Sequence, residues 1–137
     1  MSVWFRQICI RVADLDRSIG FYETLGFSVT SLNRINETLT EAILENPERG
    51  GWLQLAQDTA IPTPINRGYA VFKIYVYTDD CRKHWHAAIA AGHASTQPPM
   101  ELDRWPYTVA YLTDPDGYTV ELVQNTGDDA GRDCGFP

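Results

Sequence analysis

The stretch that decides the fold runs from Asp114 to Leu122 and reads Asp-Pro-Asp-Gly-Tyr-Thr-Val-Glu-Leu. Aspartate and proline favour the opening of a tight turn, and Gly117 tolerates a positive φ at its close. After the turn, Tyr118, Val120 and Leu122 alternate with Thr119 and Glu121. Successive side chains of a strand point to opposite faces. The stretch therefore predicts a turn followed by a strand in which Glu121 points either to solvent or into a polar cavity.

The first 57 residues predict a strand, a helix and three further strands. Residues 6–13 alternate apolar and polar side chains, as a strand with one apolar face does. Asp14 can cap a helix that follows at once, and Gly26 suits its C-terminal end. Three more strands are expected at residues 27–32, 39–44 and 52–57, because polar or Pro/Gly-containing turns separate them.

The same order restarts after a linker at residues 58–68. Residues 72–77 predict a strand, and a helix is expected to open at Asp79-Asp80 and to end at Gly92. A loop with Pro98, Pro99 and Pro106 follows, and then strands at residues 107–113 and 118–123. The two copies align at one offset of 66 residues, which pairs Gln7 with Lys73, Asp14 with Asp80 and Gly26 with Gly92. The chain is thus read as a duplicated module whose two sheets can pair around a shared space.

Size and charge narrow the class of protein. A chain of 137 residues suits one compact domain, here divided into a first module (1–57), the linker (58–68), a second module (69–124) and a flexible tail (125–137). The formal net charge of −7 disfavours nucleic acid and anionic membranes as partners. No apolar run approaches the roughly 20 residues of a membrane span, and the N-terminus lacks the features of a signal peptide. We expect a cytoplasmic protein.

Three groups of reactive side chains are expected to be without a catalytic role. Cys9, Cys81 and Cys134 show no C-x-x-C spacing, so neither a disulfide framework nor a zinc site is indicated, and Cys9 is expected to be a small buried residue. His84 and His86 point in different directions on a helix and are expected to face solvent. The acidic residues of the tail (Asp128, Asp129 and Asp133) lie among glycines and are read as part of a flexible terminus.

Two stretches together resemble one known family. They are the segment Val12 to Phe27, which contains Val-Ala-Asp-Leu-Asp-Arg-Ser, Phe-Tyr and Leu-Gly-Phe, and the segment Asp114 to Leu122. The chain resembles the vicinal oxygen chelate superfamily of glyoxalases, bleomycin-resistance proteins and extradiol dioxygenases. The resemblance implies an α+β fold of two βαβββ modules that form a curved mixed sheet around a ligand cavity, usually within a homodimer.

The resemblance also implies positions for a divalent metal. Family members take metal ligands from the first and last strands of each module, and these positions carry Gln7, Gln54, Lys73 and Glu121 here. A glutamine oxygen can bind a hard cation, but a protonated ammonium has no lone pair and repels a cation. We therefore expect no metal and no other cofactor at the inherited site. Lys73 is expected to pair with Glu121 and to neutralise it as the metal does in relatives.

Strand alternation extends the site that the resemblance implies. The predicted cavity residues are Gln7, Cys9, Arg11, Trp52, Gln54, Lys73, Tyr75, Tyr77 and Glu121. This set is aromatic and hydrogen-bonding, as in pockets for organic ligands. The alternative is that some of these side chains fill a dimer interface or point outward, because a one-residue shift in register reverses the faces.

These observations leave three hypotheses for the function of the protein. The first is a protein that binds a small organic molecule without a metal, of the resistance or sequestration type. The second is a lyase, isomerase or epimerase in which Glu121 is the general base and Lys73 or Arg11 stabilises an oxyanion. The third is a metal-dependent enzyme that is similar to lactoylglutathione lyase or to a dioxygenase. The sequence does not decide between binding and catalysis, since one fold hosts many chemistries.

Overall fold

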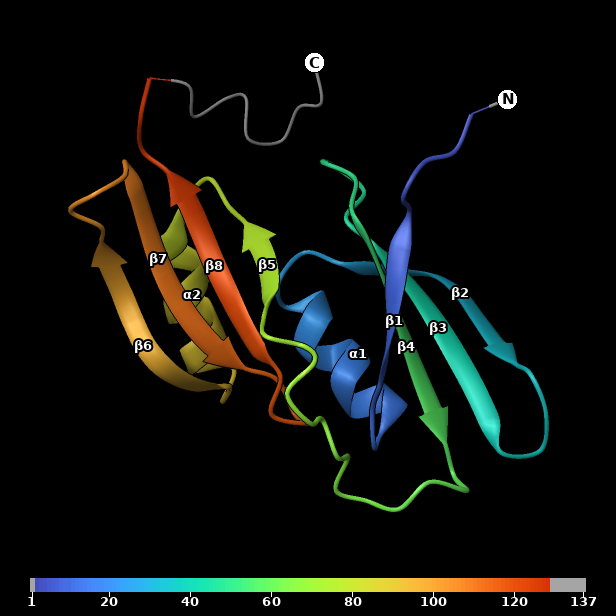
Figure 1. Cartoon of the computed structure of the whole chain (residues 1–137). Helices are drawn as coiled ribbons and strands as arrows, with labels where there is room; N and C mark the ends of the chain where they lie inside the picture. The colour runs from blue at the N-terminus through green and yellow to red at the C-terminus, as the bar shows by residue number, and fades with distance from the viewer. Residues whose placement is uncertain (1, 129–137) are drawn as a thin grey trace. The chain divides into compact units, whose positions relative to one another are not determined.

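A computed structural model describes residues 2–128 of the chain, which fall into two units that divide between Asn66 and Arg67. The first unit contains β1 (Gln7–Arg11), α1 (Leu15–Glu23), β2 (Ser28–Arg34), β3 (Leu39–Glu45) and β4 (Trp52–Asp58). The second contains β5 (Ile74–Tyr77), α2 (Cys81–Ala90), β6 (Ala94–Glu101), β7 (Tyr107–Thr113) and β8 (Thr119–Asn125). Figure 1 shows the two βαβββ units. The predicted α+β fold of two βαβββ modules is confirmed.

Each unit forms one four-stranded mixed sheet with the same topology. The strand orders are β1-β4-β3-β2 and β5-β8-β7-β6. In both sheets the first and last strands of the module are parallel neighbours, and the other pairs are antiparallel. This order matters for the site, because it places residues from the two ends of a module side by side.

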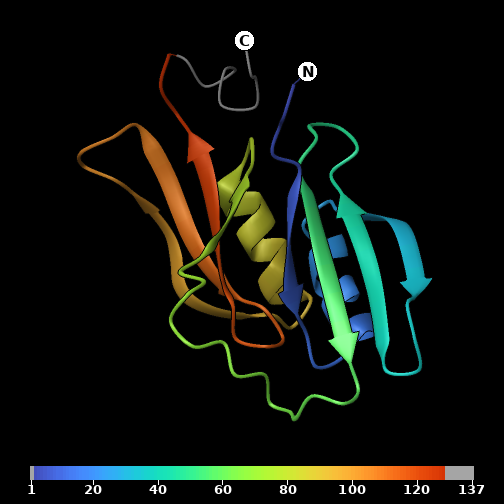
Figure 2. The same cartoon turned by 45° about the vertical axis from the view of Figure 1, so that its right-hand side comes forward.

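One face of each sheet is covered by the helix of the same unit (Figure 2). In the first unit α1 buries Leu15, Phe21 and Tyr22 on that face, where Leu44 and Leu55 are fully buried sheet residues. In the second unit Cys81 and Ala88 of α2 are buried, as are the apolar residues on one face of β7 and β8: Ala110, Leu112, Val120 and Leu122. The opposite faces carry the polar and aromatic residues of the predicted site.

The turn at Asp114 is organised by its own first side chain. Asp114 is buried, and its Oδ1 accepts from the backbone N–H groups of Asp116 and Tyr118 at 2.9 Å each. Gly117 has a φ of 91°, as the sequence predicts. Arg67 donates to the carbonyl oxygen of Gly117 at 2.6 Å and so ties the start of the second unit to this turn.

One segment differs from its prediction. Residues 94–101 are expected to be part of a loop because of Pro98 and Pro99, but they form strand β6. Proline has no N–H for a strand ladder and is tolerated at sheet edges and irregularities. β6 is the edge strand of its sheet, and its pairing with β7 shifts in register between Gln97 and Met100, where both prolines lie. The prediction of a loop is therefore wrong.

Neither helix in the described part of the chain has the length and apolar character needed to cross a membrane.

Candidate functional site

In the first unit, parallel pairing of β1 and β4 brings Gln7 beside Gln54. The register sets Cys9 opposite Gln54, so the side chains of Gln7, Cys9 and Gln54 share one face. Gln7 Nε2 donates to Gln54 Oε1 over 2.8 Å, and Gln54 Nε2 donates to Glu41 Oε2 over 2.7 Å. The two glutamines at the predicted metal positions are thus joined to each other and to a carboxylate.

Glu41 is a residue of this site that the sequence analysis missed. It lies on β3, where Ala42 and Leu44 are buried and the residues between them are less buried. This alternation puts Glu41 on the same face as Gln54, and it could have been read from the sequence if the buried face of residues 39–44 had been assigned. The pairing of β3 with β4 then supplies the contact.

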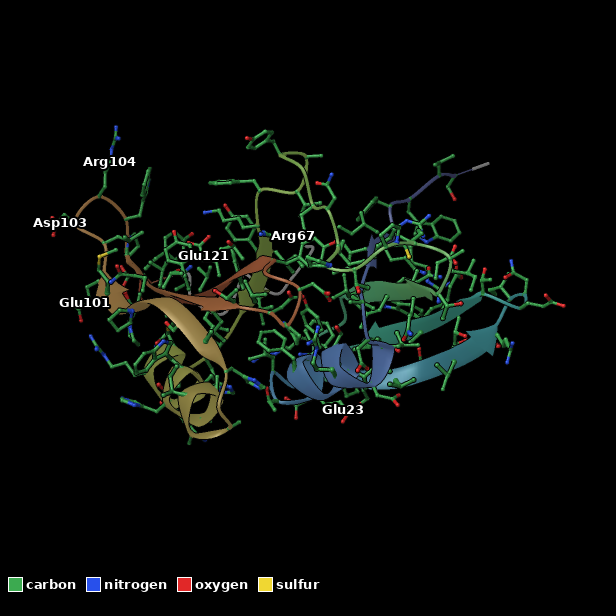
Figure 3. The ribbon with its side chains drawn as sticks, turned by 90° about the horizontal axis from the view of Figure 1, so that it is seen from below. Glu23, Arg67, Glu101, Asp103, Arg104 and Glu121 are labelled. Carbon is green, nitrogen blue, oxygen red and sulfur yellow. The ribbon has the colours of Figure 1, made fainter. Side chains whose placement is uncertain are left out.

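In the second unit, β5 and β8 bring together Lys73 and Glu121. Lys73 immediately precedes β5, and its Nζ lies 2.6 Å from Glu121 Oε2. Both side chains are largely buried, with 13% and 7% of their surface exposed. Glu121 Oε1 accepts a hydrogen bond from the hydroxyl of Tyr111 at 3.3 Å. The predicted ion pair is therefore present, and Figure 3 labels Glu121 on β8.

Aromatic rings surround the ammonium group of Lys73. Its Nζ lies 5.0, 4.8 and 5.5 Å from the ring centroids of Phe72, Tyr75 and Tyr111. Burial lowers the pKa of Lys73, but contacts with Glu121, Tyr75 and Tyr111 more than offset it, so the pKa is raised above the ordinary lysine value. Lys73 consequently stays a cation at neutral pH and is a poor nucleophile or base.

The two modules share one contact between the first strand region and the last strand. In each, a donor from the first strand region, Gln7 or Lys73, contacts an acceptor on the last strand, Gln54 or Glu121. Each pair belongs to one unit, and the assembly of all four residues into one site stays a prediction.

These residues do not fit a divalent metal. The ammonium of Lys73 stands where a cation would approach Glu121 Oε2, and Gln54 Oε1 is engaged by Gln7. Between residues 2 and 128 there is also no cluster of three or more His, Cys, Asp or Glu side chains that could hold a metal.

Cys9 differs from its prediction, because it is exposed rather than buried. It lies on the edge strand β1 and on the face away from α1, so the helix of its unit does not cover it. Although the residue is exposed, partial burial of the thiol and the nearby charge of Glu41 raise the pKa of Cys9, and Arg11 opposes them. Cys9 is accordingly a weak nucleophile at neutral pH.

Of the remaining predicted side chains, Tyr75 belongs to the surroundings of Lys73 described above, and the others have different contacts or are exposed. The ring of Trp52 is covered by the guanidinium of Arg6 at 3.6 Å, and Arg11 lies 3.9 Å from Asp58. Tyr75 and Tyr77 are exposed. The histidines show no metal-binding arrangement: His84 lies 3.6 Å from Asp79, and His86 is exposed. Residues Asp129, Asp133 and Cys134 lie outside the described part of the chain.

Comparison with known proteins agrees with the fold. The family model for the Glyoxalase/Bleomycin resistance protein/Dioxygenase superfamily matches residues 4–122. A probable lactoylglutathione lyase of Vibrio cholerae is 31% identical over 126 residues, which are 89% of this chain and 91% of that protein.

Solved structures show the same likeness. The chain is similar to the trypanothione-dependent glyoxalase I of Leishmania major, with a TM-score of 0.74, 28% identity and coverage of 89% of this chain and 86% of that one. It is also similar to glyoxalase I of Zea mays in its V278E form, with a TM-score of 0.73 and 26% identity; the match covers 88% of this chain but only 44% of the maize chain. The chain therefore belongs to the glyoxalase/bleomycin resistance protein/dioxygenase superfamily.

Proposed function

We propose that this protein binds a small organic molecule at the polar faces of its sheets and does so without a metal or other cofactor. The observation that carries the proposal is the 2.6 Å contact between Lys73 Nζ and Glu121 Oε2. A metal at Glu121 would have to displace a buried ammonium group and then lie beside its positive charge. The internal cation instead neutralises the carboxylate permanently.

The surroundings of the two pairs support an organic ligand. Tyr75 and Tyr77 alternate with buried Val76 and expose aromatic surface on the face that carries Glu121. Aromatic side chains offer apolar contact area together with a polar tip. The net charge of −7 favours neutral or cationic compounds over anions. Binding that sequesters the compound is the activity we propose.

A second candidate is an activity like that of lactoylglutathione lyase, which the name of the Vibrio cholerae relative favours. The family resemblance implies that such an activity uses a metal. A metal-free variant of this candidate would use Glu121 as a general base. Both oxygens of Glu121 already have contacts, however, since Oε2 meets Lys73 and Oε1 meets Tyr111.

The proposal is tested by restoring the family residue at position 73. The wild-type protein should purify without stoichiometric nickel, zinc, manganese or iron, and these ions should not raise its melting temperature. Lys73→His should gain metal binding, because the imidazole supplies a lone pair beside Glu121. Arg49→His is the control, since Arg49 is exposed in the turn between β3 and β4. Elemental analysis and thermal shifts measure both.

Stoichiometric metal in the wild-type protein would overturn the proposal. Lactoylglutathione lyase turnover that is lost in Glu121→Gln would then establish the second candidate. Absence of metal, together with saturable binding of aromatic or cationic compounds in a thermal-shift screen, would support the binding function.

A further inference from the structure

A chain of three polar side chains in the first unit ends in an acceptor atom without a partner. Gln7 donates to Gln54 over 2.8 Å, and Gln54 donates to Glu41 over 2.7 Å. At the other end, Gln7 Oε1 is buried and meets no hydrogen-bond donor among residues 2–128. Buried polar atoms are nearly always hydrogen-bonded in folded proteins. The oxygen of Gln7 therefore points to a donor that the described chain does not supply.

Glu41 determines which group of each glutamine donates and which accepts in this series of hydrogen bonds. An ionised carboxylate only accepts hydrogen bonds, so Gln54 turns its NH2 group toward Glu41 and its oxygen toward Gln7. That oxygen in turn requires the NH2 group of Gln7, which leaves Gln7 Oε1 at the far end. Reversal of either amide would set two acceptors against each other. The carboxylate thus fixes the orientation of two amides whose atoms are otherwise interchangeable.

A divalent cation does not suit this position. Such ions require several oxygen ligands, and the neighbouring oxygen of Gln54 is already engaged by Gln7. A single N–H or O–H group needs only the one acceptor that is present.

We infer that Glu41 is a positioning residue that makes Gln7 Oε1 a fixed acceptor, and that the site therefore selects organic molecules that carry an N–H or O–H donor. The inference rests on the proposed ligand-binding function and names the chemical class of the ligand. Glu41 acts through Gln54 and Gln7 and does not touch the ligand itself.

Matched compounds test the selection. Each pair contains a donor and its methylated counterpart: phenol and anisole, benzamide and N,N-dimethylbenzamide, indole and N-methylindole. Dissociation constants from NMR titration of the wild-type protein should favour the donor by about 3- to 10-fold, which is the range that one neutral hydrogen bond supplies. Gln7→Met removes the acceptor, and the preference should fall to about one.

Glu41→Gln should also abolish the preference while it preserves the size of the side chain. A glutamine at position 41 can donate as well as accept, so both amides can reverse and Gln7 can present its NH2 group. Glu45→Gln is the matched control. It removes the same charge from the same strand and the same face but lies outside the hydrogen-bond chain, so it should keep the wild-type preference.

Cys9 gives a measurement that needs no ligand. Partial burial and then the charge of Glu41 raise the pKa of its thiol. Glu41→Gln should therefore lower the pKa of Cys9, read from the pH dependence of its alkylation rate, with Cys9→Ser to assign the signal. Glu45→Gln should change it less.

The outcomes separate the two proposals. Equal binding of both members of each pair by the wild-type protein overturns this inference and leaves the binding function standing. Binding of none of the six compounds overturns both. A preference that survives Glu41→Gln shows that Glu41 does not set the amides and overturns its positioning role. A Cys9 pKa that does not move in that variant shows that no charged carboxylate lies beside the two amides, which removes the premise of that role.

Discussion

At the scale of single residues, the contact between Lys73 and Glu121 has the largest consequences for stability and for chemistry. Two opposite charges taken out of water are tolerated only when each satisfies the other, and removal of one leaves the other buried and unpaired. The contact therefore also links the residue that precedes β5 to β8, its parallel neighbour in the sheet.

Lys73→Met should lower the free energy of unfolding by about 3 kcal/mol, because Glu121 loses its counter-ion inside the protein. Lys83→Met, at an exposed position, should change it by less than about 0.5 kcal/mol. Urea unfolding followed by circular dichroism measures both. The double variant Lys73→Met/Glu121→Met should recover part of the loss; an equal or greater loss would mean that the pair is not coupled.

The same pair predicts a pH dependence. The pKa of Lys73 is raised above 10.5 in the folded protein, although burial acts in the opposite direction, because Glu121, Tyr75 and Tyr111 favour the cation. The stability that this shift supplies is complete below pH 10.5 and is lost as the pH rises through the folded value. The difference in stability between the wild-type protein and Lys73→Met should therefore shrink above about pH 10.5. A constant difference up to pH 12 would contradict the raised pKa.

Gly117 offers a residue-scale test of the turn that identifies the fold. Its φ of 91° strains any other residue, and a Cβ there would lie 3.0 Å from the guanidinium of Arg67. Gly117→Ala should destabilise the protein by about 2 kcal/mol. Gly50→Ala is the control, because Gly50 has a φ of 77° but no atom within 4 Å of its Cβ position. A smaller loss for Gly117→Ala than for Gly50→Ala would show that Arg67 yields without cost.

Residues differ in how far the sequence predicts them. Pairing of Lys73 with Glu121 could be predicted, because the family resemblance assigns both residues to metal-ligand positions on neighbouring strands. Glu41 could not be placed without the face of its strand. The exposure of Cys9 was missed for another reason: its polar neighbours show the face correctly, but whether that face is covered depends on tertiary packing.

At the scale of helices and strands, the repeat extends to the start of both helices. Asp14 is the predicted cap of α1, and Asp80 is its equivalent in the repeat, at the predicted start of α2. Each accepts from the backbone N–H three residues later, at 3.1 and 3.0 Å. The structure shows a second side-chain acceptor at the start of each helix, which was not predicted. Gln57 Oε1 accepts from the N–H of Leu15 at 2.7 Å, and Gln124 Oε1 accepts from that of Cys81 at 2.9 Å. The last strand of each module thus anchors the helix, a contact between elements that local sequence patterns cannot show.

Gln57→Leu should lower the free energy of unfolding by about 1–2 kcal/mol, because the first N–H of α1 loses its acceptor. Gln57→Glu keeps an oxygen there and adds a negative charge at a helix N-terminus, so it should cost less. The equivalent changes at Gln124 should give the same order for α2. Thermal unfolding measures all four variants, and equal losses for Leu and Glu at either position would contradict the anchoring role.

At the scale of the whole molecule, the order of the elements and the duplication were predictable except for β6, because apolar periodicity and the 66-residue offset both depend on many positions. The error at β6 shows the limit of that reasoning. Pro98 and Pro99 are strong local signals against a strand, but an edge strand with a register shift needs few of its own N–H groups.

The N-terminal segment predicts a partner for the whole chain. Val3, Trp4 and Phe5 expose 95%, 76% and 80% of their surface, and contiguous apolar surface of this kind is typical of interfaces. We expect a second copy of the chain to cover this segment in a homodimer, as the family resemblance implies.

Light scattering coupled to size-exclusion chromatography should give a mass of about twice 15.5 kDa. Burial of one Phe side chain is worth about 2 kcal/mol and a homodimer contains two, so Phe5→Ser should weaken the dimer by about 1,000-fold. Trp105→Ser is the control, since Trp105 is 55% exposed in the turn between β6 and β7 and should leave the dimer intact. A wild-type monomer at high concentration, or a dimer that is indifferent to Phe5→Ser, would assign the exposed segment to another role.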